Sequence, residues 1–408
     1  MNPRTDHKIV VIGAGYAGIL AANRVQASLT PQEGRRVRIT IVNPLPDFID
    51  RVRLHELAAG VRASAAVPLD DMLHARIRVV VGRVVRIDPS VRALTVTTGT
   101  CVTSETYDTL LYAVGSMAEL GAPGAEEFAH LLSNLAGAES ARVAIADGRS
   151  DQRIIVVGGG ATGVEAAAEV AEQHPTASVT LVSRGAVLGH LPLASRRSVA
   201  RSLAQLGVTV LEGSGVGRVH ADAVELTDGT RLPSDVTVWT ASFAVPDLAR
   251  RSGLAVDSIG RLLVDEKLRT PAHPEIFGAG DAVQPPSSVG SHLRMGCAIA
   301  MPVGGHAADN VLAVLRGGPL TDLDVGFGAQ CISIGRKTAL IQLLTRADQP
   351  RAVRITGRAG ALVKEWVCRV LATGAPRRER SRPGSLRLPS GPRRLPVDQG
   401  LTSEIHTV

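Results

Sequence analysis

The chain alternates short apolar runs rich in β-branched residues with alanine-rich stretches, beginning at residue 8 with KIVVIGAGYAGILAANR. Residues 9–12 predict a buried strand, because a short continuous apolar run that ends in glycine fits a parallel sheet covered on both faces. The alanine-rich residues after the glycines predict a helix. A second β-branched run at residues 37–42 predicts the next strand, so the chain opens as a strand, helix and strand unit.

The same pattern returns at residue 153 with RIIVVGGGATGVEAAAEVAE, followed by a predicted strand at residues 178–182. The first glycines of the two patterns, Gly13 and Gly158, are 145 residues apart, which is about one domain length. The predicted fold class is therefore α/β, with two Rossmann-like dinucleotide-binding domains and a small C-terminal α+β segment.

Breaks between these patterns divide the chain into five parts. Residues 1–150 are expected to form the first part of one domain and residues 263–320 its second part, on either side of an inserted domain at residues 151–262. Residues 321–375 are expected to form a C-terminal interface or membrane-contact segment. Residues 376–408, rich in Pro, Arg and Ser, are expected to be a disordered basic tail.

Both glycine clusters have the spacing G-x-G-x-x-G between a predicted strand and a predicted helix. In such a unit the first glycine permits the turn, the second lets a pyrophosphate approach the backbone, and the third lets helix pack on strand. The diphosphate then faces the amides and the positive dipole end of the helix. One cluster alone could be plain strand-to-helix packing, but two in the same context indicate two dinucleotide sites. The glycines are Gly13, Gly15 and Gly18 in the first cluster and Gly158, Gly160 and Gly163 in the second.

The strand that follows each helix ends without an acid. Dinucleotide sites of this type usually place an acid there to bind ribose hydroxyls, whereas the first unit has Asn43. An amide can bind hydroxyls without the charge-assisted strength of a carboxylate. The second unit has Ser183 and Arg184, and a cation with no neighbouring acid favours a 2′-phosphate, so NADPH is weakly preferred over NADH.

Three further places carry candidate ligand-binding residues. Arg53 lies in a helix expected at residues 47–60, and either a solvated helix face or an arginine near a diphosphate fits its position. Gly115 ends a buried apolar strand. Gly280 and Asp281 follow a short apolar strand, where the carboxylate could reach a ligand hydroxyl or cap the next helix.

The formal net charge of +7 raises the question of nucleic-acid binding. Seven arginines and one glutamate between residues 377 and 394 contribute +6 of that charge, so the rest of the chain is nearly neutral. No nucleic-acid partner is therefore expected. The excess of 41 arginines over four lysines fits codon bias in a GC-rich genome.

The four cysteines lie at positions 101, 297, 331 and 368, and no pair has a C-x-x-C or C-x-x-x-x-C spacing. Neither a short-spaced disulfide nor a metal site is therefore expected, and such scattered thiols fit a reducing compartment. Residues 1–7 are polar and lead into the first strand without the apolar run of a secretory signal. We expect a cytoplasmic protein.

The two glycine clusters, YDTLLYAVGS between them and IFGAGDAV after the second together resemble the two-dinucleotide flavoprotein family of pyridine-nucleotide oxidoreductases, over residues 8–316. The resemblance implies FAD in the first domain, NAD(P)H in the inserted one, and a bond from Asp281 to the FAD ribitol. The absence of a close cysteine pair separates the chain from the disulfide-reductase branch. GATGVE at residues 160–165 and NPLPDFIDRVRLHEL at residues 43–57 are closer to type II NADH dehydrogenases and related actinobacterial FAD-dependent oxidoreductases.

The resemblance implies hydride transfer from NAD(P)H to the flavin and electron transfer to a small acceptor, with a quinone as the leading expectation. In that branch the carboxylate matching Glu165 lies near the nicotinamide, which makes Glu165 the candidate catalytic residue, although a first-turn acid can also simply stabilise its helix. Quinone-reducing members carry A-Q-x-A-x-Q at the start of the late helix, whereas this chain reads MGCAIAM at residues 295–301, so the acceptor stays open. A ferredoxin-type protein acceptor and a flavoprotein sensor without fast turnover are the alternatives, and a homodimer is a further expected assembly.

An amphipathic helix is expected at residues 359–373, with Leu362, Trp366 and Val370 on one side. Packing of this apolar side on its own domain is the favoured expectation. Because a tail of charge +6 follows, the alternative is peripheral contact of the helix and tail with the inner face of the cell membrane.

Overall fold

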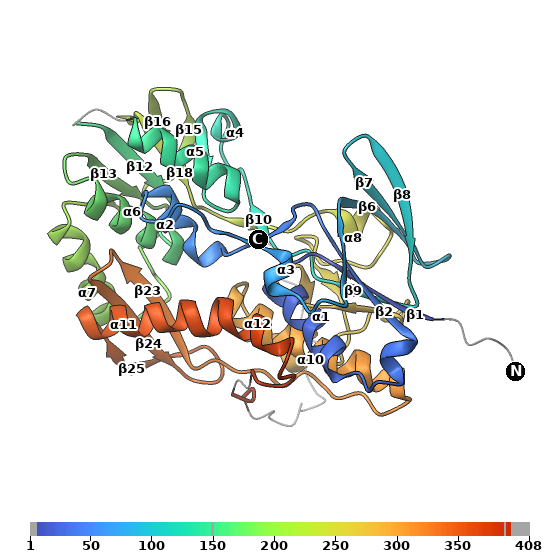
Figure 1. The fold of residues 1–408 in the computed structure, drawn as a ribbon. Helices are drawn as coiled ribbons and strands as arrows, with labels where there is room; N and C mark the ends of the chain where they lie inside the picture. The colour runs from blue at the N-terminus through green and yellow to red at the C-terminus, as the bar shows by residue number, and fades with distance from the viewer. Residues whose placement is uncertain (1–5, 148–150, 387–388, 393–408) are drawn as a thin grey trace, which may run out of the picture.

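The computed structural model describes residues 6–147, 151–386 and 389–392. Two open parallel sheets form the body of the molecule, and a C-terminal segment of strands and helices, coloured orange to red in Figure 1, runs from the second unit to the first. The α/β class and the duplicated Rossmann-like unit are confirmed. The short elements outside the sheets and layers described below are α3 (Leu69–Met72), α4 (Ala125–Phe128), α8 (Leu248–Arg251), α9 (Ser287–Gly290), β20 (Leu262–Leu263), β22 (Val283–Gln284) and a 3₁₀ turn at Glu33–Arg35.

The first sheet combines strands from both sides of the inserted unit, and all its neighbours are parallel. Helices α1 (Tyr16–Ser28) and α10 (Cys297–Arg316) pack closely, since a Cβ on Gly304 would lie 2.5 Å from the carbonyl oxygen of Ala17. By length and composition α10 could span a membrane, but more than half of it is buried in the protein. The strand order is β21 (Ile276–Gly278), β9 (Thr109–Tyr112), β1 (His7–Ile12), β2 (Val37–Asn43) and β5 (Arg78–Val81).

The second sheet is also parallel and is covered by α5 (Leu135–Ala146), α6 (Ala161–Gln173) and α7 (Leu193–Gln205). It includes one strand that precedes residue 150, so the expected boundary there is wrong. Its order is β11 (Ala129–Leu131), β18 (Val236–Trp239), β12 (Arg153–Val157), β13 (Ser178–Val182) and β14 (Thr209–Leu211).

The chain crosses between the two units at a short antiparallel pair, β10 (Met117–Ala118) with β19 (Phe243–Ala244). After this pair, Val245 and Leu248 already pack in the core of the first unit. The expected boundary at residue 262 is therefore also wrong, because the return crossing falls earlier in the chain.

Each unit also carries a three-stranded antiparallel sheet. The first of these sheets contains β6 (Arg83–Asp88), β7 (Ala93–Thr98) and β8 (Cys101–Thr106), and the second contains β15 (Val216–Val219), β16 (Ala223–Leu226) and β17 (Arg231–Pro233).

The helix expected at residues 47–60 is mostly absent. β3 (Asp47–Ile49) pairs with β4 (Ala66–Pro68), a 3₁₀ turn covers Arg51–Arg53, and α2 (Leu54–Ala58) is the only α-helical part. Phe48 is completely buried in this arrangement. Tertiary pairing with residues further along the chain therefore overrides the local helical pattern.

The C-terminal segment consists of an antiparallel sheet and a long helical stretch. The sheet contains β23 (Ala329–Ile334), β24 (Thr338–Leu344) and β25 (Pro350–Ile355), and the helical stretch contains α11 (Gly357–Trp366), a π-helical part at Val367–Thr373 and α12 (Gly374–Glu379).

The expectation of a disordered tail from residue 376 is wrong for the described part. Glu379 on α12 is completely buried and accepts hydrogen bonds from Nε and Nη2 of Arg24 on α1, at 2.9 and 3.0 Å. The amide of Leu386 donates to the same carboxylate at 2.9 Å. This charge pair docks the start of the tail, and residues 393–408 lie outside the described part of the chain.

Helix α11 is oriented opposite to the favoured expectation. Leu362 is 74% exposed and Trp366 is 54% exposed. The side chain of Lys364 points inward and its Nζ lies 2.8 Å from a carboxylate oxygen of Glu165. The polar side of the helix therefore faces the protein, because a buried carboxylate there requires a cation.

Candidate functional site

The two glycine clusters have the same geometry. Gly13 and Gly158 have φ angles of +98° and +125°, a region that favours glycine. Their amides donate to Val42 and Val182, at 2.8 and 2.9 Å. The expected turn after each first strand is confirmed.

The third glycine of each cluster lets the helix approach the turn. A Cβ on Gly18 would collide with the carbonyl oxygen of Gly13, and a Cβ on Gly163 would collide with that of Gly158. No larger residue fits at Gly18 or Gly163 without displacement of the helix from the strand.

The second glycine of each cluster faces open space. No heavy atom of the described chain lies within 4 Å of a Cβ placed on Gly15 or Gly160, and the same holds at Gly115. The N-terminal amides of α1 and α6 are at these openings, so both cradles suit a diphosphate. The residues therefore fit two dinucleotides.

Asp281 lies between the loop that follows β9 and the start of α10. Its carboxylate accepts hydrogen bonds from Oγ of Ser116 at 2.7 Å and from the amide of Gly296 at 2.8 Å. Gly280 has a φ of +83° and packs close to α1, since its Cβ would lie 3.3 Å from Cβ of Ala17. Asp281 thus joins the loop after β9 to the residue that precedes α10, beside the first cradle.

Asn43 is held by the first cradle itself. Its Oδ1 accepts from the amide of Ala14 at 2.9 Å, and its Nδ2 donates to the carbonyl of Leu45 at 2.8 Å. The amide side chain therefore braces the glycine turn, and its contact with a ribose stays a prediction.

Ser183 and Arg184 have different environments. Ser183 is buried, and its Oγ fills the space where a Cβ of Gly159 would be. Arg184 is exposed, and no hydrogen bond or ion pair of its guanidinium is found within the described ranges. Of the two, Arg184 has the cation available for a phosphate.

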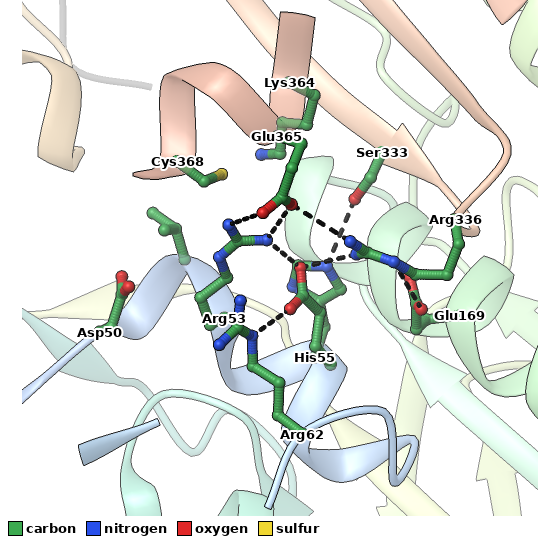
Figure 2. Close-up of polar contacts among 12 residues, drawn as sticks. Asp50, Arg53, His55, Arg62, Glu169, Ser333, Arg336, Lys364, Glu365 and Cys368 are labelled. Carbon is green, nitrogen blue, oxygen red and sulfur yellow. Dashed lines mark hydrogen bonds and ion pairs between the residues drawn. The ribbon is translucent and has the colours of Figure 1, made fainter. Parts of the chain in front are cut away.

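Arg53 has partners other than the expected diphosphate. It is only 2% exposed, and its guanidinium binds Glu56 on α2 and Glu365 on α11, the latter at 2.7 and 2.9 Å (Figure 2). Arg51 instead donates to the carbonyl of Ser116 at 2.9 Å, so Arg51 is the arginine near Asp281. The local sequence placed two arginines two residues apart but did not reveal which one faces which unit.

Glu165 lies where the two units and the C-terminal segment meet. Its Oε1 accepts from the amide of Ser333 on β23 at 3.0 Å and lies 2.8 Å from Nζ of Lys364. The Oγ of Ser333 also lies 3.3 Å from Nε2 of His55 on α2. One carboxylate on α6 is thus bound by residues of β23 and α11, with α2 beside it.

Burial acts to raise the pKa of Glu165, but Lys364, His55 and the amide of Ser333 together outweigh it, so the net shift of the pKa is downward. Burial acts to lower the pKa of Lys364, but Glu165, with Cys368 and Cys331, outweighs burial and raises that pKa well above its usual value. Burial lowers the pKa of His55. The junction therefore holds an ionised Glu165 and Lys364 next to a neutral imidazole.

Lys364, Ser333 and His55 were not identified as site residues from the sequence. They come from segments far from Glu165 along the chain, and only the fold brings them together. The rarity of lysine was an available signal, because the chain has only four lysines. In the structure Lys337, like Lys364, contacts an acid of α6: its Nζ lies 3.8 Å from a carboxylate oxygen of Glu172.

The thiols near this junction are protonated. Burial raises the pKa of Cys297 to about 12 and that of Cys331 to about 11, although Lys364 opposes both shifts. In the described part of the chain the cysteines are free, and no group of three or more His, Cys, Asp or Glu could hold a metal ion.

Comparison with known proteins gives a consistent result. Residues 7–296 match the family described as pyridine nucleotide-disulphide oxidoreductase. The chain is 30% identical over 356 residues to an NADH dehydrogenase-like protein of Mycobacterium tuberculosis. The match covers 82% of this chain and 87% of that protein. It is 27% identical over 328 residues to a type II NADH:quinone oxidoreductase of the same species, covering 69% of this chain and 68% of that protein.

A solved structure with the same fold is the sulfide:quinone oxidoreductase of Aquifex aeolicus, with a TM-score of 0.78, 19% identity and 93% of each chain covered. At this identity the likeness concerns the fold alone. It covers a larger share of the chain than the family match, which ends at residue 296.

Proposed function

Because the chain belongs to the pyridine nucleotide-disulphide oxidoreductase family, and is an FAD-dependent NAD(P)H oxidoreductase, we propose that a quinone accepts its electrons. When bound, FAD would supply the hydride chemistry that links NAD(P)H to a second electron acceptor. The observation that carries the proposal is the Glu165 and Lys364 pair at the junction of both units and the C-terminal segment. A quinone takes up protons when it is reduced, and this junction is built from groups that can exchange them.

The proposal assigns the residues of each cradle to one dinucleotide. Gly13, Gly15 and Gly18 would hold the FAD diphosphate at the start of α1, and Asp281, which is hydrogen-bonded to Ser116, would bind the ribityl chain. Two observations support this assignment: the open space at Gly15 and the position of Asp281 beside the same cradle. Gly115 and Gly280 shape the same side of the site, and Asn43 braces the turn.

The second cradle holds NAD(P)H in the proposal. Gly158, Gly160 and Gly163 take the diphosphate at the start of α6, and Glu165, in the first turns of the same helix, lies toward the nicotinamide end. Ser183 and Arg184 follow β13, where the adenosine ribose of such a unit binds. The exposed guanidinium of Arg184 supports use of NADPH as well as NADH.

The outward face of α11 supports contact with a membrane surface. Leu362 and Trp366 are more than half exposed, and Val353 on the adjacent β25 is 59% exposed. Four exposed arginines lie within four residues of these apolar positions along the chain, and cations next to exposed apolar residues favour an anionic lipid surface. The protein is then cytoplasmic and peripheral at the inner face of the cell membrane. The arginines are Arg351, Arg354, Arg358 and Arg369.

Acceptor identity is tested by steady-state turnover of the FAD-loaded protein with a soluble menaquinone analogue and with a ferredoxin. We expect saturable NADH oxidation with the quinone and none with the ferredoxin, because the chain outside residues 377–394 is nearly neutral in net charge, which does not favour an acidic protein partner. Turnover with ferredoxin alone would replace the proposed acceptor. Negligible flavin reduction by NADH or NADPH would instead favour a sensor.

Membrane contact is tested by sedimentation with vesicles that contain anionic phospholipid. The double variant Leu362→Glu and Trp366→Glu is expected to remain in the supernatant, whereas the natural chain sediments. The control Val143→Glu changes an exposed apolar residue of α5 far from this face along the chain. Equal sedimentation of all three proteins contradicts a role for α11.

A further inference from the structure

One face of α6 carries three glutamates, Glu165, Glu169 and Glu172. They are spaced four and three residues apart, which places consecutive side chains about 5–6 Å apart at Cβ on the same side of a helix. Glu165 is the member at the Lys364 pair described above. The other two extend from that pair along the helix toward its C-terminal end.

Glu169, the middle glutamate, is completely buried and is not satisfied by hydrogen bonds. Neither of its carboxyl oxygens has a hydrogen-bond partner within the described ranges. The nearest cation is Arg336, whose Nε is 3.7 Å from Oε1 (Figure 2). Such an isolated buried carboxyl group is costly in its ionised form.

Arg336 does not neutralise Glu169, because its guanidinium is shared with other acids. Its Nη1 donates to Glu56 at 2.7 Å and its Nη2 to Glu365 at 3.2 Å. Burial raises the pKa of Glu169 to about 8; Arg336 opposes this shift, while the charges of Glu56, Glu172 and Glu165 add to it. At neutral pH the group is therefore mainly a neutral acid with a proton to give.

The outer glutamate connects the row to solvent. Glu172 accepts from the backbone amide of Arg336, and its other oxygen lies 3.8 Å from Nζ of Lys337, whose side chain is 81% exposed. The row thus runs from an exposed cation at Glu172, through the neutral acid, to the ionised pair of Glu165 and Lys364.

The proposed reaction requires a proton from water. NADH supplies two electrons and one proton as hydride, and reduction of a quinone to a quinol takes two electrons and two protons. One proton per turnover must therefore come from solvent and reach the junction.

We propose that Glu169 is the proton carrier between the surface at Glu172 and the pair of Glu165 and Lys364. Glu169 gives its proton toward the pair when the acceptor is reduced, and it takes a proton from solvent by way of Glu172 afterwards. The inference rests on the proposed function for the need of a proton at this junction. The presence of the proton on Glu169 in the resting protein does not depend on the acceptor.

The first experiment observes that proton directly. Infrared spectra of the FAD-loaded natural chain are expected to show a protonated-carboxyl band that titrates near pH 8 and is absent in Glu169→Gln. The control Glu139→Gln, an exposed position on α5, is expected to keep the band. A natural chain without such a band above pH 6 overturns the inference.

The second experiment separates proton transfer from electron transfer. Ferricyanide accepts electrons without protons, so Glu169→Gln is expected to retain ferricyanide turnover within twofold while menaquinone-analogue turnover falls at least tenfold at pH 7.5. The solvent isotope effect on the quinone reaction is expected to rise. Glu139→Gln is expected to match the natural chain with both acceptors.

The outcomes distinguish the two proposals. If the natural chain reduces ferricyanide but no quinone, the proposed acceptor is wrong. If it reduces the quinone and Glu169→Gln has the same ratio of quinone to ferricyanide turnover and the same pH profile, Glu169 only packs against Arg336 and the proton-carrier inference fails. If Glu169→Gln loses quinone and ferricyanide turnover in equal proportion, the proton-carrier inference also fails, because such a loss shows a general structural defect.

Discussion

The helices α1 and α6 begin with the same glycine cradle but continue differently. Nearly all of α1 is buried, and its polar residues Asn23 and Arg24 hold the C-terminal segment through Pro376 and Glu379. Helix α6 instead meets the C-terminal segment with acids. Arg336, in the turn between β23 and β24, lies beside Glu169, and Lys364 on α11 pairs with Glu165. We infer that the cradle determines where a dinucleotide can bind, whereas the later turns of each helix determine how the C-terminal segment packs there.

The two contacts also differ in their connection to the site. At α1 the hydroxyl of Tyr16 donates to Asp50 at 2.7 Å, and Thr373 donates to the other oxygen of Asp50 at the same distance. This contact holds one well-paired carboxylate. At α6, Glu169 is left without a hydrogen bond. The contact at α1 is therefore saturated, in the sense that Asp50 has a partner on each oxygen, whereas the contact at α6 keeps a carboxyl group that can exchange a proton.

The largest expected effect comes from replacing the third glycine of either cradle with valine. Gly18→Val would force α1 away from Gly13, and we expect about 3 kcal/mol or more of destabilisation and loss of bound flavin. Gly163→Val is expected to leave the protein yellow but to abolish flavin reduction by NAD(P)H. Flavin absorbance and denaturant unfolding measure both, and loss of flavin in the Gly163 variant alone contradicts the assignment of the cradles.

Removal of the charge on Glu379 tests the saturated contact. Glu379→Gln leaves Arg24 without its buried partner, which should lower the free energy of unfolding by about 3 kcal/mol. Burial acts to raise the pKa of Glu379, but Arg24 and the amides of Leu386 and Gly384 together lower it overall. This stabilisation is therefore full above the unfolded pKa of about 4.3 and is lost as pH falls below it. Urea unfolding at pH 7 and pH 3 checks the prediction: a variant with the natural chain's pH dependence contradicts it.

At the contact of α6 with the C-terminal segment, Lys364→Met is expected to lower quinone turnover more than ferricyanide turnover. Loss of the cation raises the pKa of Glu165, and quinone turnover should fall about 100-fold, within the range for general acid–base groups. Arg369→Met, an exposed cation in the π-helical part that follows α11, serves as the control. Equal quinone turnover in both variants would show that α6 and α1 hold the C-terminal segment in the same purely structural way.

Arg184 is expected to give the smallest effect. Arg184→Ala should raise KM for NADPH about threefold to tenfold, equal to about 0.7–1.4 kcal/mol, and leave KM for NADH unchanged. The reason is that an exposed cation interacts with a phosphate through solvent-screened charge. Parallel steady-state kinetics with the two nicotinamides decide it, and a strong natural preference for NADH defeats the expectation.

Much of the fold could be predicted because the motifs are local. Gly13 and Gly158 need positive φ angles, and strand, turn and helix follow each other within about 20 residues in both units. Gly18 and Gly163 pack on their own turns, so the sequence alone located both cradles.

The errors arose where distant segments compete with local pattern. β11 precedes the expected domain boundary but pairs with β18, about 100 residues later. Glu379 lies in a segment with the composition of a disordered tail, and its structure depends on Arg24 near the start of the chain. Neither pairing leaves a periodic signal in the sequence.

The candidate site shows the same division. Glu165 could be identified beside its glycine cluster, but its partners Lys364 and Ser333 lie in the C-terminal segment, which carries no short motif. The amphipathic pattern of α11 was visible, whereas its direction depended on the buried charge of Glu165. Local sequence predicts where a cofactor binds more readily than which residues surround its reactive end.

The most direct test of the central claim is an anaerobic stopped-flow experiment in two mixing steps with the FAD-loaded chain. We expect NADH or NADPH to bleach the flavin absorbance in the first step and a menaquinone analogue to restore it in the second. Purified protein that remains colourless and takes up no added FAD, or flavin that neither nicotinamide bleaches, would contradict the account.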